Sequence, residues 1–387
     1  MDPGAGRFFV MRTTASYDLF PDAPSGRAMA RARWLAQQGR VTEAERAYRS
    51  VLATQPDLKA CWAECFELLR SHDRREDALR LAEAALGHFG HAAFPLALQG
   101  AGLIELGRFR DALAALEQAI ERDPDLGLAW HELGYAAYRL GDPNRALLAL
   151  DRAFALEPHT ETLQLRGRIL RDAGRYQAAE VAFEGAAQAS EHAEQRAVAE
   201  REILATRRYA SFAPRRPEDL NAGERWFADT GTVVLAPDPG PVAPSDEALI
   251  KAFVELATAA GWRFGHVIAL GPTLAVWRTL ADALRAPLVS RAAWNAAACP
   301  LVVAPRPLPA EPAWVTLTEA IGRDGAGLVF ALEHPVDGPT GGDSGADVIG
   351  VLTDQGVRRH RMPNPARALA DSRVPGARVA GRRLRPA

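Results

Sequence analysis

Cysteine and lysine are scarce in this chain of 387 residues, and long apolar runs are missing. Its three cysteines are Cys61, Cys65 and Cys299. So few thiols, odd in number, do not make a disulfide framework and indicate a reducing compartment. Lys59 and Lys251 are the only lysines, while arginine and alanine are abundant. We interpret that bias as the codon usage of a GC-rich bacterial genome and attach no function to it.

Targeting segments are also missing from the sequence. No stretch approaches the 18 or so apolar residues that a membrane span requires, and residues 1–20 lack the apolar core of a signal peptide. We therefore expect a cytoplasmic protein without membrane contact. The net charge of −2 predicts no general attraction to nucleic acid or to acidic membranes. A hydrophobic fraction of 48% is that of a folded globular protein.

The stretch 127–158 reads GLAWHELGYAAYRLGDPNRALLALDRAFALEP and organises the chain. It predicts a helix at 127–140, a turn at 141–142 and a second helix at 143–156. Gly134 and Ala146 would let the two helices approach closely, and Gly141 would allow the positive φ that ends the first helix. The motif spacings W-x2-L-G and A-x3-large, with a closing proline, are carried by Trp130, Leu133, Gly134, Ala146, Leu150 and Pro158.

The same pattern recurs with a period of about 34 residues. The turn positions are Gly39, Asp73, Gly107, Gly141 and Gly174. The small residue of the second helix recurs as Ala44, Ala78, Ala112, Ala146 and Ala179. The bulky residue four positions later is Tyr48, Ala82, Leu116, Leu150 and Phe183. Five repeats follow, at 25–58, 59–92, 93–126, 127–159 and 160–193, of which the second departs most, through Ala82 and Gly90.

This periodic motif resembles the tetratricopeptide repeat, a helix–turn–helix unit. The resemblance covers roughly half of the chain. It implies an α-solenoid in which each repeat contacts only its neighbours, closed by a terminal helix with a polar outer face. The charged helical segment 194–210 suits that capping role.

The rest of the chain has a different composition. Short apolar runs alternate with amphipathic segments, which predicts a smaller α/β domain with a largely parallel sheet and no assigned family. We expect strands at 232–236, 266–270, 287–290, 301–304, 327–332 and 347–353, and helices at 245–260, 273–285 and 314–321. The predicted organisation is a flexible lead at 1–24, the repeats at 25–193, the capping helix at 194–210, a linker at 211–222, the α/β domain at 223–356 and an arginine- and proline-rich tail at 357–387.

The resemblance also implies a binding surface. In this family the first helices of the repeats line a concave groove that holds a peptide. The positions carried over are Arg33, Glu67, Arg70, Ile104, His131, Tyr135, Tyr138, Arg168 and Arg171, with Met29, Ala97 and Ala101 beside them. Arginine binds carboxylates bidentately and tyrosine adds contact area at low entropic cost. We expect the aromatic and arginine side chains of repeats four and five to contribute most.

Two other clusters are considered as sites. Cys61, Cys65, His88 and His91 could approach one another at one end of repeat two, but Cys65 falls on a core position, so we expect no metal. Glu333, His334 and Asp337 precede a Thr340, Gly341, Gly342 run that is faintly similar to a phosphoribosyltransferase loop, although the spacing differs and a strand follows. No nucleophile–base set, P-loop or dinucleotide fingerprint is present, and we expect no cofactor.

These observations predict a non-catalytic interaction scaffold that binds a protein or peptide partner in the groove of the repeats. The alternative is an enzyme whose active site lies in the α/β domain and whose repeats recruit a partner. A third possibility is an adaptor that contacts RNA through the arginine-rich tail. We consider it weaker, because no aromatic side chains are interleaved with the arginines.

Overall fold

A computed structural model describes residues 24–235, 244–272, 275–295, 298–308, 310–335, 345–354, 357–358, 378 and 384. The chain forms two compact units. The first comprises residues up to 173 together with 181–199, and the second comprises 174–180 together with the residues from 200 onward.

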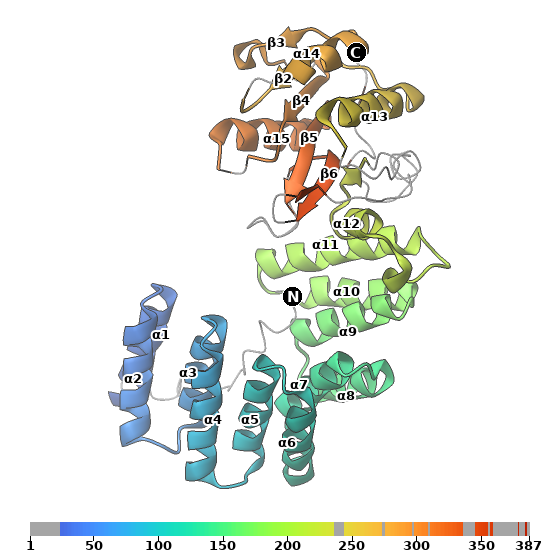
Figure 1. Ribbon diagram of the computed structural model, residues 1–387. Coiled ribbons are helices and arrows are strands. Elements are labelled where there is room, and N and C mark those ends of the chain that lie inside the picture. Colours follow the sequence, from blue (N-terminus) through green and yellow to red (C-terminus); the bar gives the residue numbers. More distant parts are fainter. Residues whose placement is uncertain are drawn as a thin grey trace. The chain divides into compact units, whose positions relative to one another are not determined.

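Helices in consecutive pairs form the repeats, which belong to the first unit except for residues 174–180 (Figure 1). The pairs are α1 (Pro24–Gln37) with α2 (Val41–Thr54), α3 (Lys59–Ser71) with α4 (Arg75–Phe89), α5 (Ala93–Glu105) with α6 (Phe109–Arg122), α7 (Gly127–Arg139) with α8 (Pro143–Leu156), and α9 (Thr160–Asp172) with α10 (Tyr176–Ala189). The two helices predicted for repeat four are confirmed to within one residue at each end.

The predicted turn residues end the first helix of each pair. All of them have a positive φ, a conformation that glycine adopts without a steric penalty. The φ angles are 70° at Gly39, 59° at Asp73, 72° at Gly107, 82° at Gly141 and 73° at Gly174. The chain then reverses, and backbone bonds such as that from the Arg108 N–H to the Leu103 carbonyl, at 2.9 Å, close the turn.

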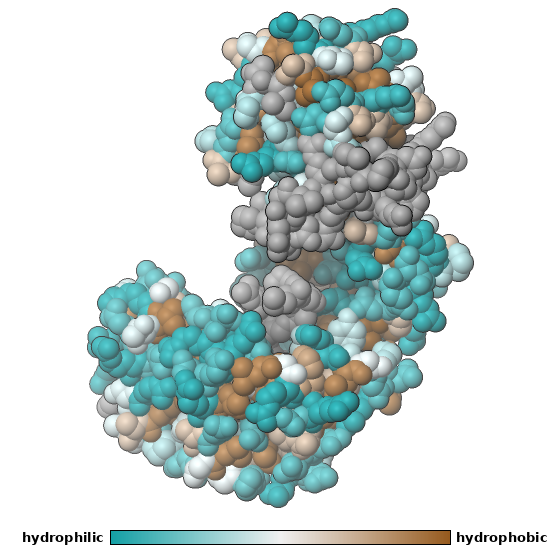
Figure 2. All heavy atoms as spheres, viewed as in Figure 1, coloured by the Kyte–Doolittle hydropathy of each residue, from teal (hydrophilic) through white to brown (hydrophobic). Residues whose placement is uncertain are grey.

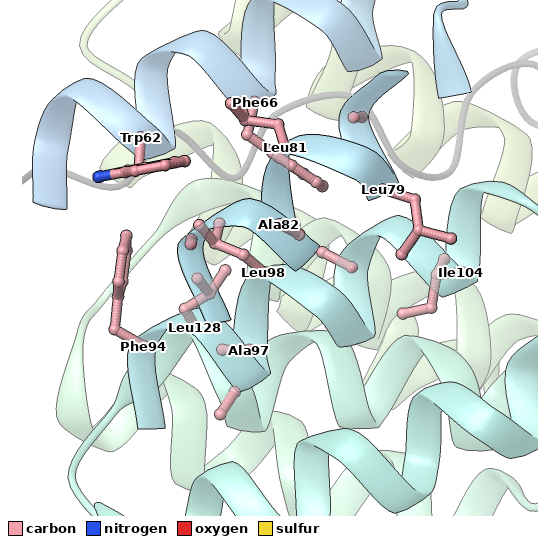
Figure 3. Close-up of a cluster of buried hydrophobic side chains, with 14 of the residues drawn as sticks. Trp62, Phe66, Leu79, Leu81, Ala82, Phe94, Ala97, Leu98, Ile104 and Leu128 are labelled. Carbon is pink, nitrogen blue, oxygen red and sulfur yellow. The ribbon is translucent and has the colours of Figure 1, made fainter. Parts of the chain in front are cut away.

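Helix pairs approach most closely where the first helix carries glycine. A Cβ atom built on Gly134 would lie 2.8 Å from Cγ of Leu150, and one on Gly100 would lie 2.5 Å from Cγ of Leu116. Repeat two reverses this arrangement. At the position equivalent to Gly134 it has Phe66, and at the position equivalent to Leu150 it has Ala82. Figure 3 shows both side chains in the buried cluster of α3, α4 and α5.

First helices of neighbouring repeats also contact one another, as between α3 and α5, α5 and α7, and α7 and α9. They form one layer of the unit, and the second helices form the other. Trp62 and Trp130 join successive repeats, because each indole N–H donates to the carbonyl of the proline that ends the preceding repeat, Pro56 at 2.7 Å and Pro124 at 2.8 Å. Hydrophilic residues cover most of the visible surface of these helices (Figure 2).

Helix α11 (Ala193–Ala210) is the predicted capping helix, and the division between the two units falls within it. The guanidinium of Arg208 donates to the carbonyls of Ala228 at 2.8 Å and Asp229 at 2.9 Å. The Tyr209 hydroxyl donates to the Asp229 carboxylate at 2.7 Å. The C-terminal turns of α11 therefore pack on helix α12 (Ala222–Thr230), which begins at the end of the predicted linker.

The second unit is built on a sheet whose order is β1-β6-β5-β4-β2-β3, with β7 beside β6. All pairs are parallel except β6 with β7. This confirms the predicted parallel sheet. The strands are β1 (Val233–Val234), β2 (His266–Ala269), β3 (Leu288–Val289), β4 (Pro300–Ala304), β5 (Leu328–Pro335), β6 (Val348–Asp354) and β7 (Val357–Arg358).

Helices cover both faces of this sheet. Alternate strand residues such as Val303 and Phe330 pack in the core that α13 (Asp246–Ala259) and α14 (Ala275–Leu284) supply. The intervening residues, such as Val302 and Val329, pack with α15 (Pro312–Asp324). Successive side chains of a strand point to opposite faces of the sheet, so alternate residues belong to the two cores. Within the described ranges, no helix combines the length and apolar character needed to cross a bilayer.

Candidate functional site

A hollow of about 350 Å³ opens among the first helices of repeats one to four. Its walls are largely apolar and include Phe66 of α3, Leu98 and Ala101 of α5 and Leu128 of α7. Charged residues stand among them. Glu64, Glu67 and Arg70 come from α3, and Glu132 comes from α7. The contacts between α3 and α5 and between α5 and α7 bring these positions together.

Arg70 is the centre of a buried charge cluster, with 7% of its side chain exposed. Its guanidinium donates to Glu67 at 2.9 Å from Nε, and the Nη2 atom lies 2.7 Å from the same carboxylate. The Nη1 atom lies 3.7 Å from Glu105 and 3.6 Å from Glu132. Three carboxylates from α3, α5 and α7 thus share one cation.

Burial dominates the acid–base behaviour of this cluster. Desolvation raises the pKa of Glu67 and of Glu132 to about 7, although the charge of Arg70 acts in the opposite direction. Burial likewise raises the pKa of Glu105. A carboxylate removed from water loses solvation that a single shared arginine does not replace, so its charged form is disfavoured. The cluster is therefore short of positive charge.

A second ion pair lies at the edge of the hollow. Arg33 of α1 binds both carboxylate oxygens of Glu64, at 2.9 Å from Nε and 2.7 Å from Nη2. The hydroxyl of Tyr48 donates to the same carboxylate at 3.1 Å. Burial and the neighbouring Glu64 charge raise the pKa of Tyr48, so the phenol stays protonated. Arg33 and Arg70, two of the predicted groove arginines, are therefore both engaged with carboxylates of the chain itself.

The remaining predicted groove residues lie outside the hollow. Ile104 is buried in the core of the repeats. His131 and Tyr135 are only 8% exposed, so repeat four does not present the open aromatic face that the sequence suggests. Neighbouring side chains cover them. The His131 ring lies 3.0 Å from the Thr162 hydroxyl, and the Arg139 guanidinium donates to the Tyr135 hydroxyl at 2.8 Å.

Burial also decides the protonation of His131. Desolvation, with the nearby charge of Arg70, lowers the pKa of His131 to about 3. The imidazole is therefore neutral in the physiological range. Tyr138, the third predicted aromatic of repeat four, is half-buried and donates to the Asp172 carboxylate. This face of α7 contacts α9 instead of standing free.

The two arginines predicted in repeat five are half-buried. Arg171 lies with its guanidinium carbon 5.8 Å from the centre of the Phe183 ring. The Nε atom of Arg168 is buried and makes no hydrogen bond within the described part of the chain. Nothing in these contacts tests their role in binding, which remains a prediction.

Sequence reasoning missed Glu64 and Glu132. Both stand two residues after a tryptophan, in Trp62-Ala63-Glu64 and in the equivalent triplet that begins at Trp130. The two triplets are two repeats apart, and Leu98 occupies the same position in the repeat between them. The recurrence of a W-x-E triplet on an inner helix was the signal that could have identified these carboxylates.

The side chains of the two other clusters considered from the sequence make contacts of other kinds. Cys61 donates to the Tyr48 carbonyl at 3.4 Å, and His88 lies 2.8 Å from Asp57. No group of three possible metal ligands occurs in the part of the chain that the structure describes. His334 is buried beside the Trp226 ring at 4.8 Å, at the carboxyl end of β5. Asp337 and the run at 340–342 lie outside the described residues.

The repeats are a part of the chain that is similar to known proteins. The family model of the tetratricopeptide repeat matches residues 97–159 and 131–194. The matched residues are tetratricopeptide repeats. An Hsp70-Hsp90 organizing protein of Triticum aestivum is 35% identical over 92 residues, which is 21% of this chain and 15% of that protein. The chain thus spans a small part of the length of this curated relative.

Solved structures, among them two of tetratricopeptide repeat proteins, resemble part of the chain. A thermophilic member from Thermus thermophilus has a TM-score of 0.42 at 17% identity, over 46% of this chain and 99% of its own. The pilF protein of Pseudomonas aeruginosa has a TM-score of 0.37 at 17% identity, over 49% and 85%. YrrB, described as having an unusual peptide-binding site, has a TM-score of 0.31 at 15% identity, over 48% and 98%.

Proposed function

We propose that this protein is an interaction adaptor whose tetratricopeptide repeats bind a segment of a partner protein. The observation that carries the proposal is the hollow of about 350 Å³ among α1, α3, α5 and α7. A concave, largely apolar site with a few convergent polar groups is the usual form of a binding site. A solenoid that needs only to be stable has no use for charges buried in such a hollow.

The cost of the charge cluster supports this proposal. Burying a carboxylate without full compensation costs several kcal/mol, and a buried ion pair is often less stable than apolar packing of the same volume. Glu132 carries this cost, because its side chain is 6% exposed and burial raises its pKa to about 7. Function is the common reason for retaining buried charges in a cleft.

The curated relative offers a parallel at the level of protein class. The wheat protein is named for organizing Hsp70 and Hsp90, two other proteins. We take from this only the general role of an adaptor. The partner of the present chain, and the part of the repeats that it contacts, are separate questions for experiment.

A blocking substitution tests the proposal. Ala63 is half-buried and lines the hollow, so Ala63→Phe should fill the site without entering the core. Ala84 is an exposed residue of α4, and Ala84→Phe is the matched control. Short random peptides displayed on phage are selected on the full chain, and the enriched peptides are then synthesised. They should bind the Ala63→Phe protein at least about tenfold more weakly and the control unchanged. Equal binding to all three proteins would refute the hollow as the site.

A further inference from the structure

We propose that the hollow receives an arginine or lysine side chain of the partner. This inference rests on the proposed function and specifies the chemistry of its ligand. It differs from the expectation drawn from the sequence, in which partner carboxylates meet the arginines of the groove.

Negative charge exceeds positive charge in and around the hollow. Glu64 is matched by Arg33, which binds it with two guanidinium nitrogens. Glu67, Glu105 and Glu132 share Arg70, and Glu105 also feels the charge of Arg75. When Glu64, Glu67 and Glu132 of the hollow are ionised, these three carboxylates face the two guanidinium groups of Arg33 and Arg70. A partner carboxylate would increase this imbalance, whereas one cation would reduce it.

Glu132 is the group most in need of a partner. Its side chain is 6% exposed, and among the described residues its nearest cation is the Nη1 atom of Arg70 at 3.6 Å. That distance is too long for a hydrogen bond. Glu132 nevertheless lines the hollow, so its carboxylate is reachable from there. A buried carboxylate without a hydrogen-bond donor is costly, and an ammonium or guanidinium group entering the hollow supplies donors.

The walls suit the stem of such a side chain. Phe66, Leu98, Ala101 and Leu128 line the hollow with hydrocarbon. Arginine and lysine bury their methylene stems against apolar surface while the charged head reaches a polar partner. Here the stem would pass along these walls and the head would stop between Glu132 and Glu67. The arrangement therefore selects a long basic side chain over a short or acidic one.

The arginines available for an acidic ligand are already engaged. Arg33 and Arg70 each bind a carboxylate of the chain at 2.7 Å. A carboxylate-bearing ligand would have to displace Glu64 or Glu67 and leave that partly buried residue without its cation. For Arg70, whose side chain is 7% exposed, breaking the pair in this way is strongly unfavourable. A basic ligand displaces neither pair.

The test uses the peptides selected on the full chain. We expect those that the Ala63→Phe substitution weakens to share one arginine or lysine flanked by apolar residues. Glu132→Gln keeps the shape of the side chain and removes its charge. Calorimetry should show these peptides binding the Glu132→Gln protein at least about tenfold more weakly. Glu83→Gln, on an exposed residue of α4, should leave the affinity unchanged.

A substitution in the peptide shows whether Glu132→Gln acts directly on the basic side chain. Replacing the shared basic residue of the peptide by glutamine should weaken binding to the wild type, but should have little further effect on binding to the Glu132→Gln protein. Peptides that need an open hollow but show no basic residue, or that bind the Glu132→Gln protein equally well, would overturn this inference and leave the proposed function intact. Peptides indifferent to Ala63→Phe would overturn the proposed function itself.

Discussion

Gly134 sets the distance between α7 and α8. A Cβ atom at this position would lie 2.8 Å from Cγ of Leu150 and 3.2 Å from the Ala146 carbonyl oxygen. Gly134→Leu should therefore destabilise the repeats by about 1–3 kcal/mol or more, because overpacking a close contact forces the helices apart. Gly87 of α4 has open space around it, so Gly87→Leu is the control and should not destabilise. Chemical denaturation followed by circular dichroism measures both, and an unchanged Gly134→Leu midpoint would contradict the packing described.

Glu132 should make the stability of the repeats depend on pH. Its pKa is raised from 4.5 to about 7, so folding favours the protonated form. The stability contribution is complete below about 4.5 and is lost as pH rises through 7. Arg70 and Glu67 on α3 and Glu105 on α5 are the charged groups that face it. Glu132→Gln cannot ionise and should avoid this loss.

The difference between the two proteins is the quantity to measure. At pH 8 we expect Glu132→Gln to be more stable than wild type by about 1–3 kcal/mol, and at pH 5 we expect the two to be nearly equal. Urea denaturation at the two pH values gives both numbers. A constant difference between pH 5 and 8 would show that Glu132 titrates normally. The same substitution should weaken peptide binding while it stabilises the fold, which separates a functional effect from simple damage.

Helix pairing in repeat two depends on an exchange of large and small side chains. Phe66 stands where repeats three and four have glycine, and Ala82 stands where they have leucine. Phe66→Gly alone should cost about 3–5 kcal/mol by leaving a cavity, and Ala82→Leu alone about 1–3 kcal/mol by overpacking. The double substitution restores the pattern of the other repeats. It should be more stable than the sum of the two changes predicts, by about 0.5–3 kcal/mol. Additive losses would mean that the two side chains do not share one space.

The repeat elements were predictable because each has a local cause. Gly141 and its equivalents must adopt positive φ, and Gly134 must admit a neighbouring helix, so period and spacing alone locate the turns and helices. The strands of the second unit followed from short apolar runs such as 301–304. In the sequence, Ala82 was an anomaly at the position where the other repeats have a bulky side chain. The side chain that compensates for it, Phe66, lies on the other helix of the pair, so the motif of the second helix alone did not explain it.

The site was less predictable, because burial depends on neighbouring repeats. Carrying over groove positions selected Glu67 and Arg70, which line the hollow. It could not show that Thr162 and Arg139 would cover His131 and Tyr135. The sequence of repeat four alone also did not identify Glu132, because its ion-pair partner Arg70 lies on α3, two repeats earlier.

At the scale of the whole molecule, the extent of the repeat unit can be tested with fragments. The sequence predicts that a fragment of residues 25–210 ends with the capping helix. The end of α11 packs on α12, however, where Arg208 and Tyr209 bind Ala228 and Asp229. A fragment of residues 25–230 should therefore melt several degrees higher than 25–210. Arg208→Met should lower the melting temperature of the longer fragment only. Equal melting temperatures for the two fragments would place the boundary at 210.

Binding of a partner segment in the hollow is the central claim, and one affinity comparison tests it most directly. The measurement is the calorimetric dissociation constant of a selected, arginine- or lysine-bearing peptide for the full chain and for the Ala63→Phe protein, with Ala84→Phe as the control. The hollow is the binding site if Ala63→Phe weakens the peptide by about tenfold or more and Ala84→Phe does not. The same affinity for all three proteins would contradict the claim.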